Sequence, residues 1–544
     1  METVVLVLAM MLAVVASGFL VRVLPVPLPL PLVQIALGAL IAGALDRSVA
    51  LDPDIFFLLF LPPLLFLDGW RIPNYGLLRD KATILELALG LVVFTVAGIG
   101  LLIHWMIPAM PLPVAFALAA ILSPTDPVAV SSIAARTPIP KRLLHILQGE
   151  ALLNDASGLV CFRFALAVML TGALSPASAV LTFLWVVAIG AGVGVLLTWG
   201  ATALQMWLSG RLGEEAGSPI LVSLLLPFGA YLLAEQLQAS GILAAVAAGI
   251  TMSYVELTGR APATTRVDRA AVWSAVQFSL NGVVFVLLGE QLPGLLEGAM
   301  KAVREGGHAN PWWLAAYALA ISLGLGVLRF TWVWTSLRLT IFAARHRGEK
   351  VVKPQWRLLA AATLAGTRGA VTLAGVMTLP LLLPDGTVFP TRDLAVFLAA
   401  AVILFSLVAA SLGLPRVLQG LKLPEDDAAR VQEDKARSEA ALAAIGAVEQ
   451  ALREVPVDPA DADARAGAAE WVIERYRRRV VVGARAGVAR GQRRKALVAE
   501  KALLLVGLHA ERETVFALAR QSHISDETAR KLVREIDLVE ARYR

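Results

Sequence analysis

The segment that decides the fold is Ala115–Ala135, "AFALAAILSPTDPVAVSSIAA", an apolar run interrupted by Pro124, Thr125, Asp126 and Pro127. Its length suits a membrane-spanning helix, because about 20 apolar residues cross a bilayer. Each proline removes a backbone donor and clashes with the preceding turn, so the helix must break here. Non-helical backbone at membrane depth is tolerated only where it is buried in protein or lines a cavity. The segment therefore predicts a broken membrane helix with an acid at its break.

The composition extends this interpretation to most of the chain. Of the 544 residues, 58% are hydrophobic and 17% are charged, whereas a soluble domain has about 45–50% apolar and 25% charged residues. Apolar runs follow one another up to about Gly420, and the remainder is charged and rich in alanine. We therefore expect an all-α polytopic membrane protein, with a transmembrane domain at residues 1–420. Residues 421–544 are expected to form a cytoplasmic helical domain with a regulatory or dimer-contact role.

The apolar runs number about thirteen, each long enough to cross a bilayer. They cover residues 3–21, 27–45, 54–69, 83–107, 111–134, 144–171, 177–208, 217–236, 240–256, 271–291, 311–337, 358–382 and 393–414. The loops after even-numbered spans carry few basic residues, namely Arg47, Lys301, Arg304 and Arg392. Because basic loops stay in the cytoplasm, the N-terminus is predicted outside the cell membrane and the C-terminal domain inside. The same bias accounts for the net charge of +6, so no nucleic-acid partner is expected.

A second interrupted span occurs in the segment 361–376, "AATLAGTRGAVTLAGV", where Gly366 and Gly369 flank Arg368. If the seventh span is a linker, this twelfth span occupies the same place in its half as the fifth span does in the first half. The two are seven places apart, an odd number, so the halves would have opposite orientations and form an inverted repeat. Interrupted helices at matching positions of two halves point to the binding site of a transporter.

The sixth span contains Gly149–Gly158, "GEALLNDASG", with two acids and an amide in apolar surroundings. Intramembrane acids cost several kcal/mol unless a partner offsets them. Glu150 and Asn154 are four residues apart and share one helix face, whereas Asp155 lies about 100° around the helix. For Glu150 the sequence favours a structural ion pair, with Arg329 or Arg368 as the partner.

Asp155 is predicted to stay free for a ligand. Its nearest basic residue in the same span is Arg163, but a separation of eight residues corresponds to about 12 Å along a helix, too far for a direct bond. Arg368 has two interpretations of equal weight. In the first it offsets a dipole of the broken helices or stands in for a mobile charge when the site is empty, and in the second it packs against a carbonyl group at a helix end.

Several other classes of function fit the sequence less well. A single cysteine and six scattered histidines exclude a disulfide or a cysteine metal cluster within the chain, and no cofactor is expected. An intramembrane hydrolase would use Asp126 and Asp155 as an aspartyl pair, but the G-x-G-D pattern expected for such enzymes is absent. We therefore expect no enzyme. A cation channel or proton-sensing receptor with the same acids remains an alternative.

Several motifs occur together and in order: "FLPPLLFLDGW" at 60–70, "SPTDPVAV" at 123–130, "GEALLNDASGLVCFRFAL" at 149–166, "SLNGVVFVLLG" at 279–289 and "GTRGAVTLAG" at 366–375. Because of these motifs, the chain resembles the monovalent cation:proton antiporter-1 family. This family comprises bacterial sodium/proton exchangers that are related to animal sodium/hydrogen exchangers. The C-terminal stretch 522–543, "SHISDETARKLVREIDLVEARY", is similar to the end of the long bacterial members.

The resemblance implies a homodimer of thirteen-span subunits in which a core domain moves against a dimerisation domain. It implies that Na⁺ binds at Asp155, with Thr125 and Asp126 close by and Asn154 shaping the site. It also implies that Glu150 pairs with Arg329, and it identifies Arg368 as the family's crossing-helix arginine. Many members have serine after the glutamate and use it to help hold the ion, but this chain has Ala151.

The expected mechanism is antiport, in which a proton and a cation compete for one carboxylate. Na⁺ is a hard ion that prefers oxygen ligands, and Asp155, Asp126, Thr125 and freed carbonyl groups of the broken helix supply oxygens. Because only one acid would exchange ions, one cation should move per proton and the exchange should be electroneutral. K⁺ or Li⁺ in place of Na⁺ remains an alternative substrate.

The C-terminal domain is expected to consist of several helices. A linker is predicted at Pro456 and Pro459, because paired prolines interrupt a helical pattern. A helix is predicted to begin at Ser525–Glu527, where acidic residues favour a helix N-terminus. The last helix has only a superficial likeness to a helix-turn-helix, so DNA binding is not expected.

Overall fold

A computed structural model of the chain describes most of its residues. The described residues are 2–23, 28–45, 53–71, 81–126, 141–171, 176–213, 217–258, 263–305, 310, 312–346, 355–380, 382–383, 386–419, 427–454, 462–483, 503–518, 521, 523 and 526–543. Pro127, the linker prolines Pro456 and Pro459, and Ser525 lie outside these ranges, so the predictions made for them are not addressed by the structure.

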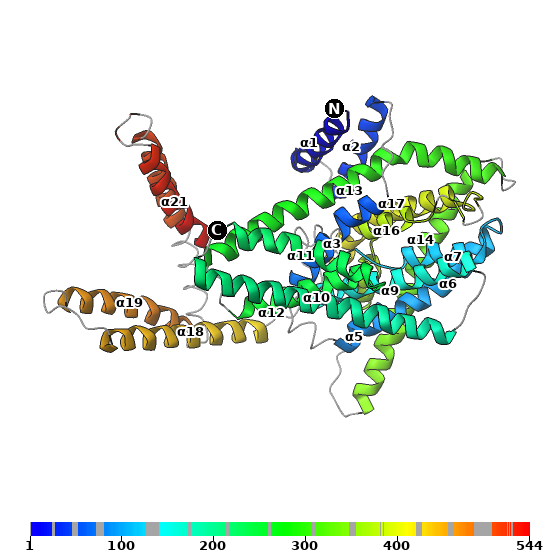
Figure 1. Ribbon diagram of the computed structural model, residues 1–544. Coiled ribbons are helices and arrows are strands. Elements are labelled where there is room, and N and C mark those ends of the chain that lie inside the picture. The colour runs from blue at the N-terminus through cyan, green and yellow to red at the C-terminus, as the bar shows by residue number, and fades with distance from the viewer. Residues whose placement is uncertain are drawn as a thin grey trace. The chain divides into compact units, whose positions relative to one another are not determined.

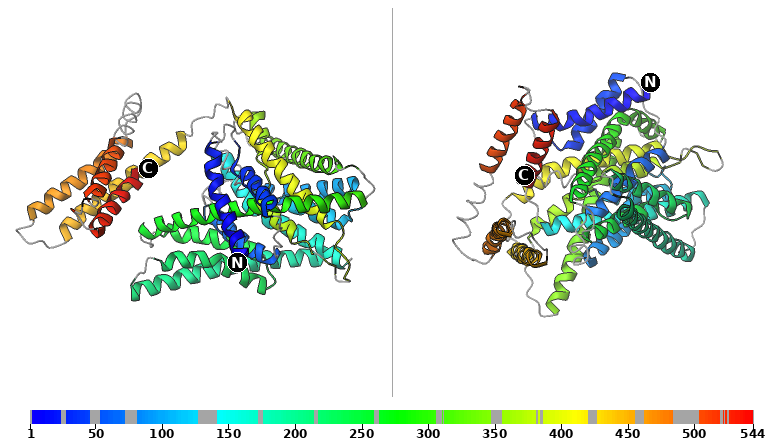
Figure 2. Two further views of the ribbon diagram at one scale, coloured as in Figure 1. Left: turned by 90° about the horizontal axis from the view of Figure 1, so that it is seen from above. Right: turned by 60° about the vertical axis from the view of Figure 1, so that its left-hand side comes forward.

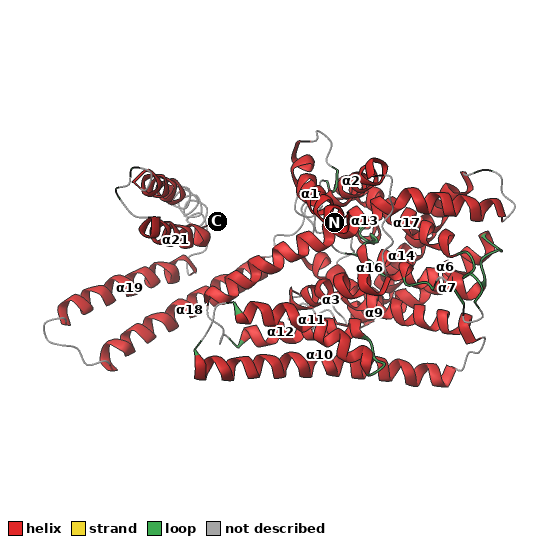
Figure 3. Cartoon of the chain, turned by 45° about the horizontal axis from the view of Figure 1, so that its top comes forward, coloured by secondary structure: helices red, strands yellow, loops and turns green. Residues whose placement is uncertain are grey.

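The described chain is helical throughout, with an isolated bridge between Leu382 and Val388 as its only extended pairing (Figure 3). The N-terminal helices are α1 (Glu2–Val23), α2 (Leu30–Leu45), α3 (Pro53–Arg71), α5 (Lys81–Leu85), the π-helical segment η1 (Glu86–Leu91), α6 (Val92–Met106), α7 (Leu112–Leu122) and α9 (Lys141–Thr171). The middle of the chain forms α10 (Pro176–Leu212), α11 (Ser218–Gln236), α12 (Gly241–Leu257), α13 (Ala263–Glu305), α14 (Trp312–His346), α15 (Trp356–Leu364), α16 (Ala370–Met377) and α17 (Arg392–Leu418). The last helices are α18 (Asp427–Glu454), α19 (Ala462–Gly483) and α21 (Asp526–Tyr543), with residues 503–518 also helical.

Many of these helices are suited to a membrane. Seven are long and apolar enough to cross one, judged by length and composition: Lys81–Met106, Leu143–Leu170, Leu184–Leu212, Ser218–Gln236, Thr264–Met300, Trp312–Leu339 and Arg392–Leu418. Four shorter apolar helices accompany them: Val7–Val23, Leu30–Gly43, Leu112–Leu122 and Gly241–Leu257. The prediction of an all-α multi-span protein is confirmed, and the exact number of spans stays a prediction.

The chain divides into two compact units, Met1–Leu421 and Lys422–Arg544. In the second unit, α18 and α19 pack against each other (Figure 2, orange). Arg512, in the helical residues 503–518, contacts Glu540 and lies 2.8 Å from Asp537, both in α21. This unit is therefore held by helix pairing and by ion pairs between its helices.

In the first unit, glycines bring helix backbones into direct contact. A Cβ atom on Gly38 of α2 would overlap the carbonyl group of Val286 in α13, and one on Gly289 of α13 would overlap that of Ile35 in α2. Gly249 of α12 makes the same kind of contact with the backbone of α3. Small residues are used in this way in membranes, where association depends on van der Waals packing rather than on a hydrophobic driving force.

The apolar core of this unit has two large parts. The main cluster joins buried residues of α1, α2, α3, α6, α7, α9, α12, α13, α14, α16 and α17. A separate lateral cluster contains Phe66, Leu67, Leu226, Ala230, Ala234, Ala239, Ala244, Ala248, Met252 and Trp273. The lateral cluster thus belongs to α3, α11, α12 and α13, with residues of α10 packed against it.

The glycine contacts give a test of the packing between α2 and α13. Gly289→Ala should lower the melting temperature of the purified protein, because the new methyl group overlaps the backbone of α2. Gly192→Ala is the matched control, since a Cβ there has no atom within 4 Å and alanine favours a helix by about 1 kcal/mol over glycine. Thermal unfolding in detergent should show a loss for the first variant and none for the second. Equal stability of both variants would contradict the tight contact.

Candidate functional site

The two predicted helix breaks meet in the structure. Helix α7 ends at Leu122 and α15 ends at Leu364, and each is followed by non-helical residues. The backbone N–H of Asp126 donates to the carbonyl oxygen of Thr367 at 2.7 Å, and the Thr367 hydroxyl donates to the carbonyl oxygen of Asp126 at 2.7 Å. Each break therefore satisfies backbone groups of the other, as membrane-embedded backbone requires.

Arg368 lies at this crossing and is buried. Its Nε donates to the carbonyl oxygen of Leu122 at 2.9 Å, and its guanidinium also donates to the carbonyl oxygen of Gly366. Its backbone N–H donates to the Ser406 hydroxyl at 3.1 Å. Because the C-terminal ends of helices carry partial negative charge, the arginine offsets the ends of α7 and α15. The contacts with carbonyl ends are compatible with both predicted interpretations of Arg368.

Asp126 lies against the start of α16. A Cβ atom on Gly369, the residue before α16, would overlap the carboxylate of Asp126. Only glycine leaves room for this approach, which explains why the break ends in glycine. The partial positive charge of the N-terminal end of α16 favours a negative carboxylate at this place.

Glu150 and Arg329 form a buried two-armed ion pair. The two terminal nitrogens of Arg329 lie 2.5 and 2.7 Å from the two carboxylate oxygens of Glu150. The Nε of Arg329 donates to the carbonyl oxygen of Ala362 at 2.9 Å, which ties α14 to α15. The exposed fractions are 0% for Glu150 and 3% for Arg329. Of the two predicted partners, the structure thus places Arg329 and not Arg368 against Glu150.

Thr125 links the break to α9. The amide nitrogen of Asn154 donates to the Thr125 hydroxyl oxygen at 3.0 Å, and this hydroxyl lies 3.5 Å from a carboxylate oxygen of Glu150. A hydroxyl has one proton and two lone pairs, so one lone pair of Thr125 is left for a ligand. The amide oxygen of Asn154 is buried and has no hydrogen-bond partner within the described part of the chain.

Asp155 differs from Glu150, five residues before it in α9. Its side chain is 6% exposed, and no hydrogen bond or ion pair to its carboxylate is found among the described residues. Arg163, the basic residue considered from the sequence, instead forms an ion pair with Glu235 at 2.9 Å. The carboxylate of Asp155 is therefore buried and still able to bind a ligand.

The sequence prediction missed a third acid, Asp68 in α3. Its carboxylate interacts electrostatically with that of Asp126, and Asp155 interacts with both. Helix α3 packs against α9 and α16, which brings these acids from distant parts of the sequence together (Figure 1). The available signal was an acid within the apolar third span, in the same stretch "FLPPLLFLDGW" that carries the family resemblance.

The site offers hard oxygen ligands, which suit an alkali cation. The described residues contain no preformed group of three His, Cys, Asp or Glu side chains around one metal position. A cation would therefore be held by one or two carboxylates together with the Thr125 hydroxyl and the Asn154 amide oxygen. The carbonyl groups of Leu122 and Asp126 accept hydrogen bonds from the twelfth span, so these two freed carbonyls already have partners.

Two interrupted helices that cross beside a buried acid are typical of secondary transporters. Comparison with known proteins specifies the class of this protein. Residues 8–420 match the family described as "Sodium/hydrogen exchanger, transmembrane". The chain belongs to the sodium/hydrogen exchanger family, a family of transporters and not of enzymes, as the sequence resemblance predicted.

Relatives in several bacteria support this assignment. The chain is 42% identical over 550 residues to the uncharacterized Na(+)/H(+) exchanger YjcE of Escherichia coli (strain K12), covering 99% of both chains. It is 42% identical over 418 residues to the sodium, potassium, lithium and rubidium/H(+) antiporter of Bacillus pumilus, covering 76% of this chain and 61% of that one.

A solved structure has the same fold. The sodium proton antiporter MjNhaP1 from Methanocaldococcus jannaschii at pH 8 superposes with a TM-score of 0.58. The superposition covers 77% of this chain and 99% of that chain, with 18% sequence identity. At this identity the similarity concerns the fold.

The Glu150–Arg329 contact gives a test of stability. Removing one partner of a buried ion pair leaves an uncompensated charge and costs about 3–5 kcal/mol. Glu150→Ala and Arg329→Ala should each lower folded yield and melting temperature, and the double variant should lose less than the sum of the two. Thermal melts of the four proteins form a double-mutant cycle. Strictly additive losses would mean that the two side chains do not stabilise each other.

Proposed function

We propose that the chain exchanges one Na⁺ for one H⁺ across the cell (inner) membrane, with both ions competing for Asp155. The proposal is carried by a contrast within α9. Glu150 is neutralised by Arg329, whereas Asp155 is also buried but has no such partner among the described residues. A proton or a Na⁺ ion can supply the missing positive charge. An empty, charged site is disfavoured by burial, which couples the release of one ion to the binding of the other.

The proposed ligands are the carboxylates of Asp155 and Asp126, the hydroxyl of Thr125 and the amide oxygen of Asn154. The amide oxygen is buried without a protein partner among the described residues, which supports its use as a ligand. Asp68 contributes negative charge near these groups. Glu150, Arg329 and Arg368 hold the surrounding helices and do not exchange ions.

Alternating access is proposed to follow from two inverted halves, spans 1–6 and 8–13. The helix contacts support this repeat. In an inverted repeat each span of one half corresponds to the span seven places away in the other half. Span 2 (α2) then corresponds to span 9 (α12), and span 10 (α13) to span 3 (α3). The pair α2 and α13 is in contact, and so is the corresponding pair α12 and α3. In the same way, α1 with α2 corresponds to α11 with α12, and α7 with α9 corresponds to α15 with α17; all four pairs are in contact.

The setting of the site is also part of the proposal. We propose a homodimer in the lipid bilayer, with the N-terminus outside and residues 421–544 in the cytoplasm. This orientation is supported by the basic loops, which stay on the cytoplasmic side. Residues 421–544 form a cytoplasmic helical domain with a regulatory or dimer-contact role.

The role of Asp155 has a direct test. Asp155→Asn should abolish Na⁺-driven proton movement in proteoliposomes while the protein still inserts and purifies like the wild type, because an amide neither binds a proton nor compensates a cation. Asp393→Asn is the matched control, since that side chain is 61% exposed and lies outside the proposed site. Wild-type exchange by the Asp155 variant would remove this residue from the mechanism.

Repeating the wild-type assay with K⁺, Li⁺ and Rb⁺ decides between a Na⁺/H⁺ antiporter and one that also accepts K⁺ or other alkali cations. The sodium, potassium, lithium and rubidium/H(+) antiporter of Bacillus pumilus makes this comparison pertinent. The same experiment addresses the channel alternative, because a channel conducts one ion without a counter-ion.

Electroneutrality has a separate test. A potential of 100 mV is worth about 2.3 kcal/mol per elementary charge moved, so a carrier that moves net charge responds to it. Clamping proteoliposomes with K⁺ and valinomycin should leave Na⁺-driven exchange unaltered, provided that K⁺ is not transported. Acceleration by one sign of potential and slowing by the other would require a second proton carrier, with Asp126 and Asp68 as candidates.

A further inference from the structure

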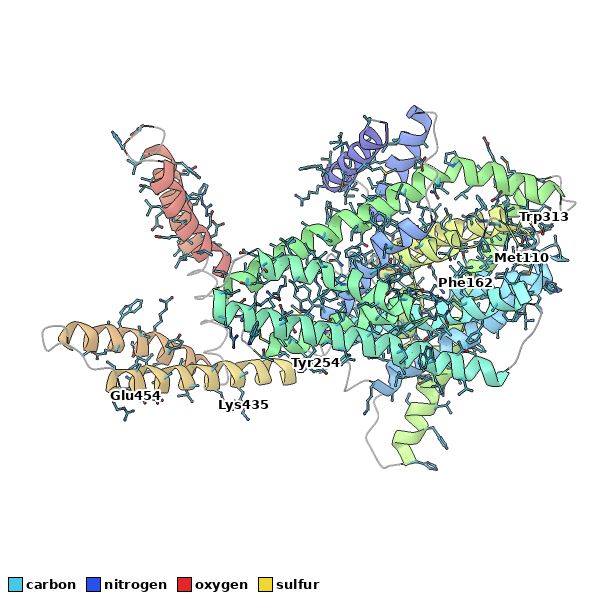
Figure 4. All side chains as sticks on the ribbon, viewed as in Figure 1. Met110, Phe162, Tyr254, Trp313, Lys435 and Glu454 are labelled. Atoms are coloured by element: carbon cyan, nitrogen blue, oxygen red, sulfur yellow. The ribbon has the colours of Figure 1, made fainter. Side chains whose placement is uncertain are left out.

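One ion pair of the first unit lies outside the proposed cation site and joins α9 to α11. The guanidinium of Arg163 lies 2.9 Å from a carboxylate oxygen of Glu235, and the exposed fractions of the two side chains are 51% and 33%. Arg163 directly follows Phe162, which is buried in the main cluster (Figure 4). Helix α9 is also the helix that carries Asp155.

Glu235 is held in place by the turn between α11 and α12. The same carboxylate oxygen accepts a hydrogen bond from the backbone N–H of Gly241 at 3.2 Å. The turn is fixed by the side chain of Ser240, which accepts from the N–H of Leu243 at 3.2 Å. It is also tied to α10, because the N–H of Ser240 donates to the carbonyl oxygen of Val186 at 3.4 Å. The carboxylate is thus a preorganised receptor for a cation from α9.

The two partners belong to different parts of the apolar core. The buried apolar residues of α9 lie in the main cluster, and those of α11, Leu226, Ala230 and Ala234, lie in the lateral cluster. The partly buried Tyr231 of α11 packs against the main cluster, so α11 lies at the boundary between the two. Helices α10, α11 and α12 pack side by side (Figure 3). An ion pair forms only where its two charged groups come within about 4 Å of each other, so this contact depends on the relative position of α9 and α11.

The ion pair has a defined place relative to the site. Arg163 follows Asp155 by eight residues, or about 12 Å along the helix. In the proposed orientation, α9 runs from the cytoplasm outward, so Arg163 lies on the outer side of Asp155. Glu235 is the penultimate residue of α11, which runs in the same direction and ends at the outer face.

We propose that the ion pair between Arg163 and Glu235 is a latch that stabilises the conformation closed to the outside, and that it breaks in every transport cycle. This inference rests on the proposed alternating access. The latch shifts the balance between the inward-open and outward-open states and does not bind the transported ions.

The first experiment measures the sidedness of exchange. A partly exposed ion pair shifts an equilibrium by roughly 1.4- to 5-fold, and apparent affinity follows the population of the competent state. Arg163→Gln and Glu235→Gln should therefore strengthen the apparent affinity for external Na⁺ and weaken that for internal Na⁺ by such factors, while exchange continues. The double variant with the charges exchanged, Arg163→Glu with Glu235→Arg, should restore the wild-type ratio of the apparent affinities for external and internal Na⁺. Single variants in which this ratio is unchanged would overturn the proposal.

The second experiment prevents the latch from opening. Arg163→Cys and Glu235→Cys are introduced together in a Cys161→Ser background, which removes the one native cysteine. A short, reducible bifunctional thiol reagent should abolish exchange, and reduction should restore it. The matched control joins α3 to α13 through Arg71→Cys and Gln277→Cys, a polar contact between two helices of the lateral cluster, and exchange should survive cross-linking there.

The outcomes separate this inference from the proposed function. Undiminished exchange in the cross-linked Arg163–Glu235 pair would show that the contact never opens, and would overturn the latch. Loss of exchange before any cross-linking would also overturn it, because the latch is not part of the ion site. A wild-type protein without cation/proton exchange would instead contradict the proposed function.

Discussion

A helix broken inside a bilayer leaves backbone groups that lipid cannot satisfy, and much of this protein's architecture answers that constraint. The break after α7 is stabilised by the break between α15 and α16, through the two hydrogen bonds between Asp126 and Thr367. Each interruption thus supplies hydrogen-bond partners for the other. The meeting of two distant segments creates a place where irregular backbone, charge and burial coincide.

The charges at this crossing follow from the same constraint. Helix ends at membrane depth carry partial charges, and the three described ends at the crossing are matched: Arg368 faces carbonyl groups at the ends of α7 and α15, and Asp126 faces the start of α16. Arg329 then neutralises Glu150 and also binds a carbonyl group of α15. The remaining acid, Asp155, is the one whose compensation is left to a mobile ion in our proposal.

The sequence predicted the parts of this arrangement that depend on local chemistry. Prolines around Asp126 and glycines around Arg368 predicted two breaks, and the spacing within "GEALLNDASG" separated Glu150 from Asp155. Long-range pairing was harder to predict. Arg329 and Arg368 remained equal candidates for Glu150 on residue chemistry alone, because helix packing decides which cation comes within reach. Asp68 was missed because only the contact of α3 with α9 and α16 brings its charge to the site.

The contrast between Glu150 and Arg163 shows how α9 connects binding to movement. Glu150 is fully buried and its partner Arg329 lies in α14, and the buried apolar residues of both α9 and α14 belong to the main cluster, so this pair is enclosed by apolar packing. Arg163 is half exposed and its partner Glu235 belongs to a helix of the lateral cluster. Breaking a buried pair costs several kcal/mol, whereas a partly exposed pair costs about 1 kcal/mol or less. A transport cycle can therefore open the second pair repeatedly while the first stays closed, and only the second is suited to a contact between moving parts.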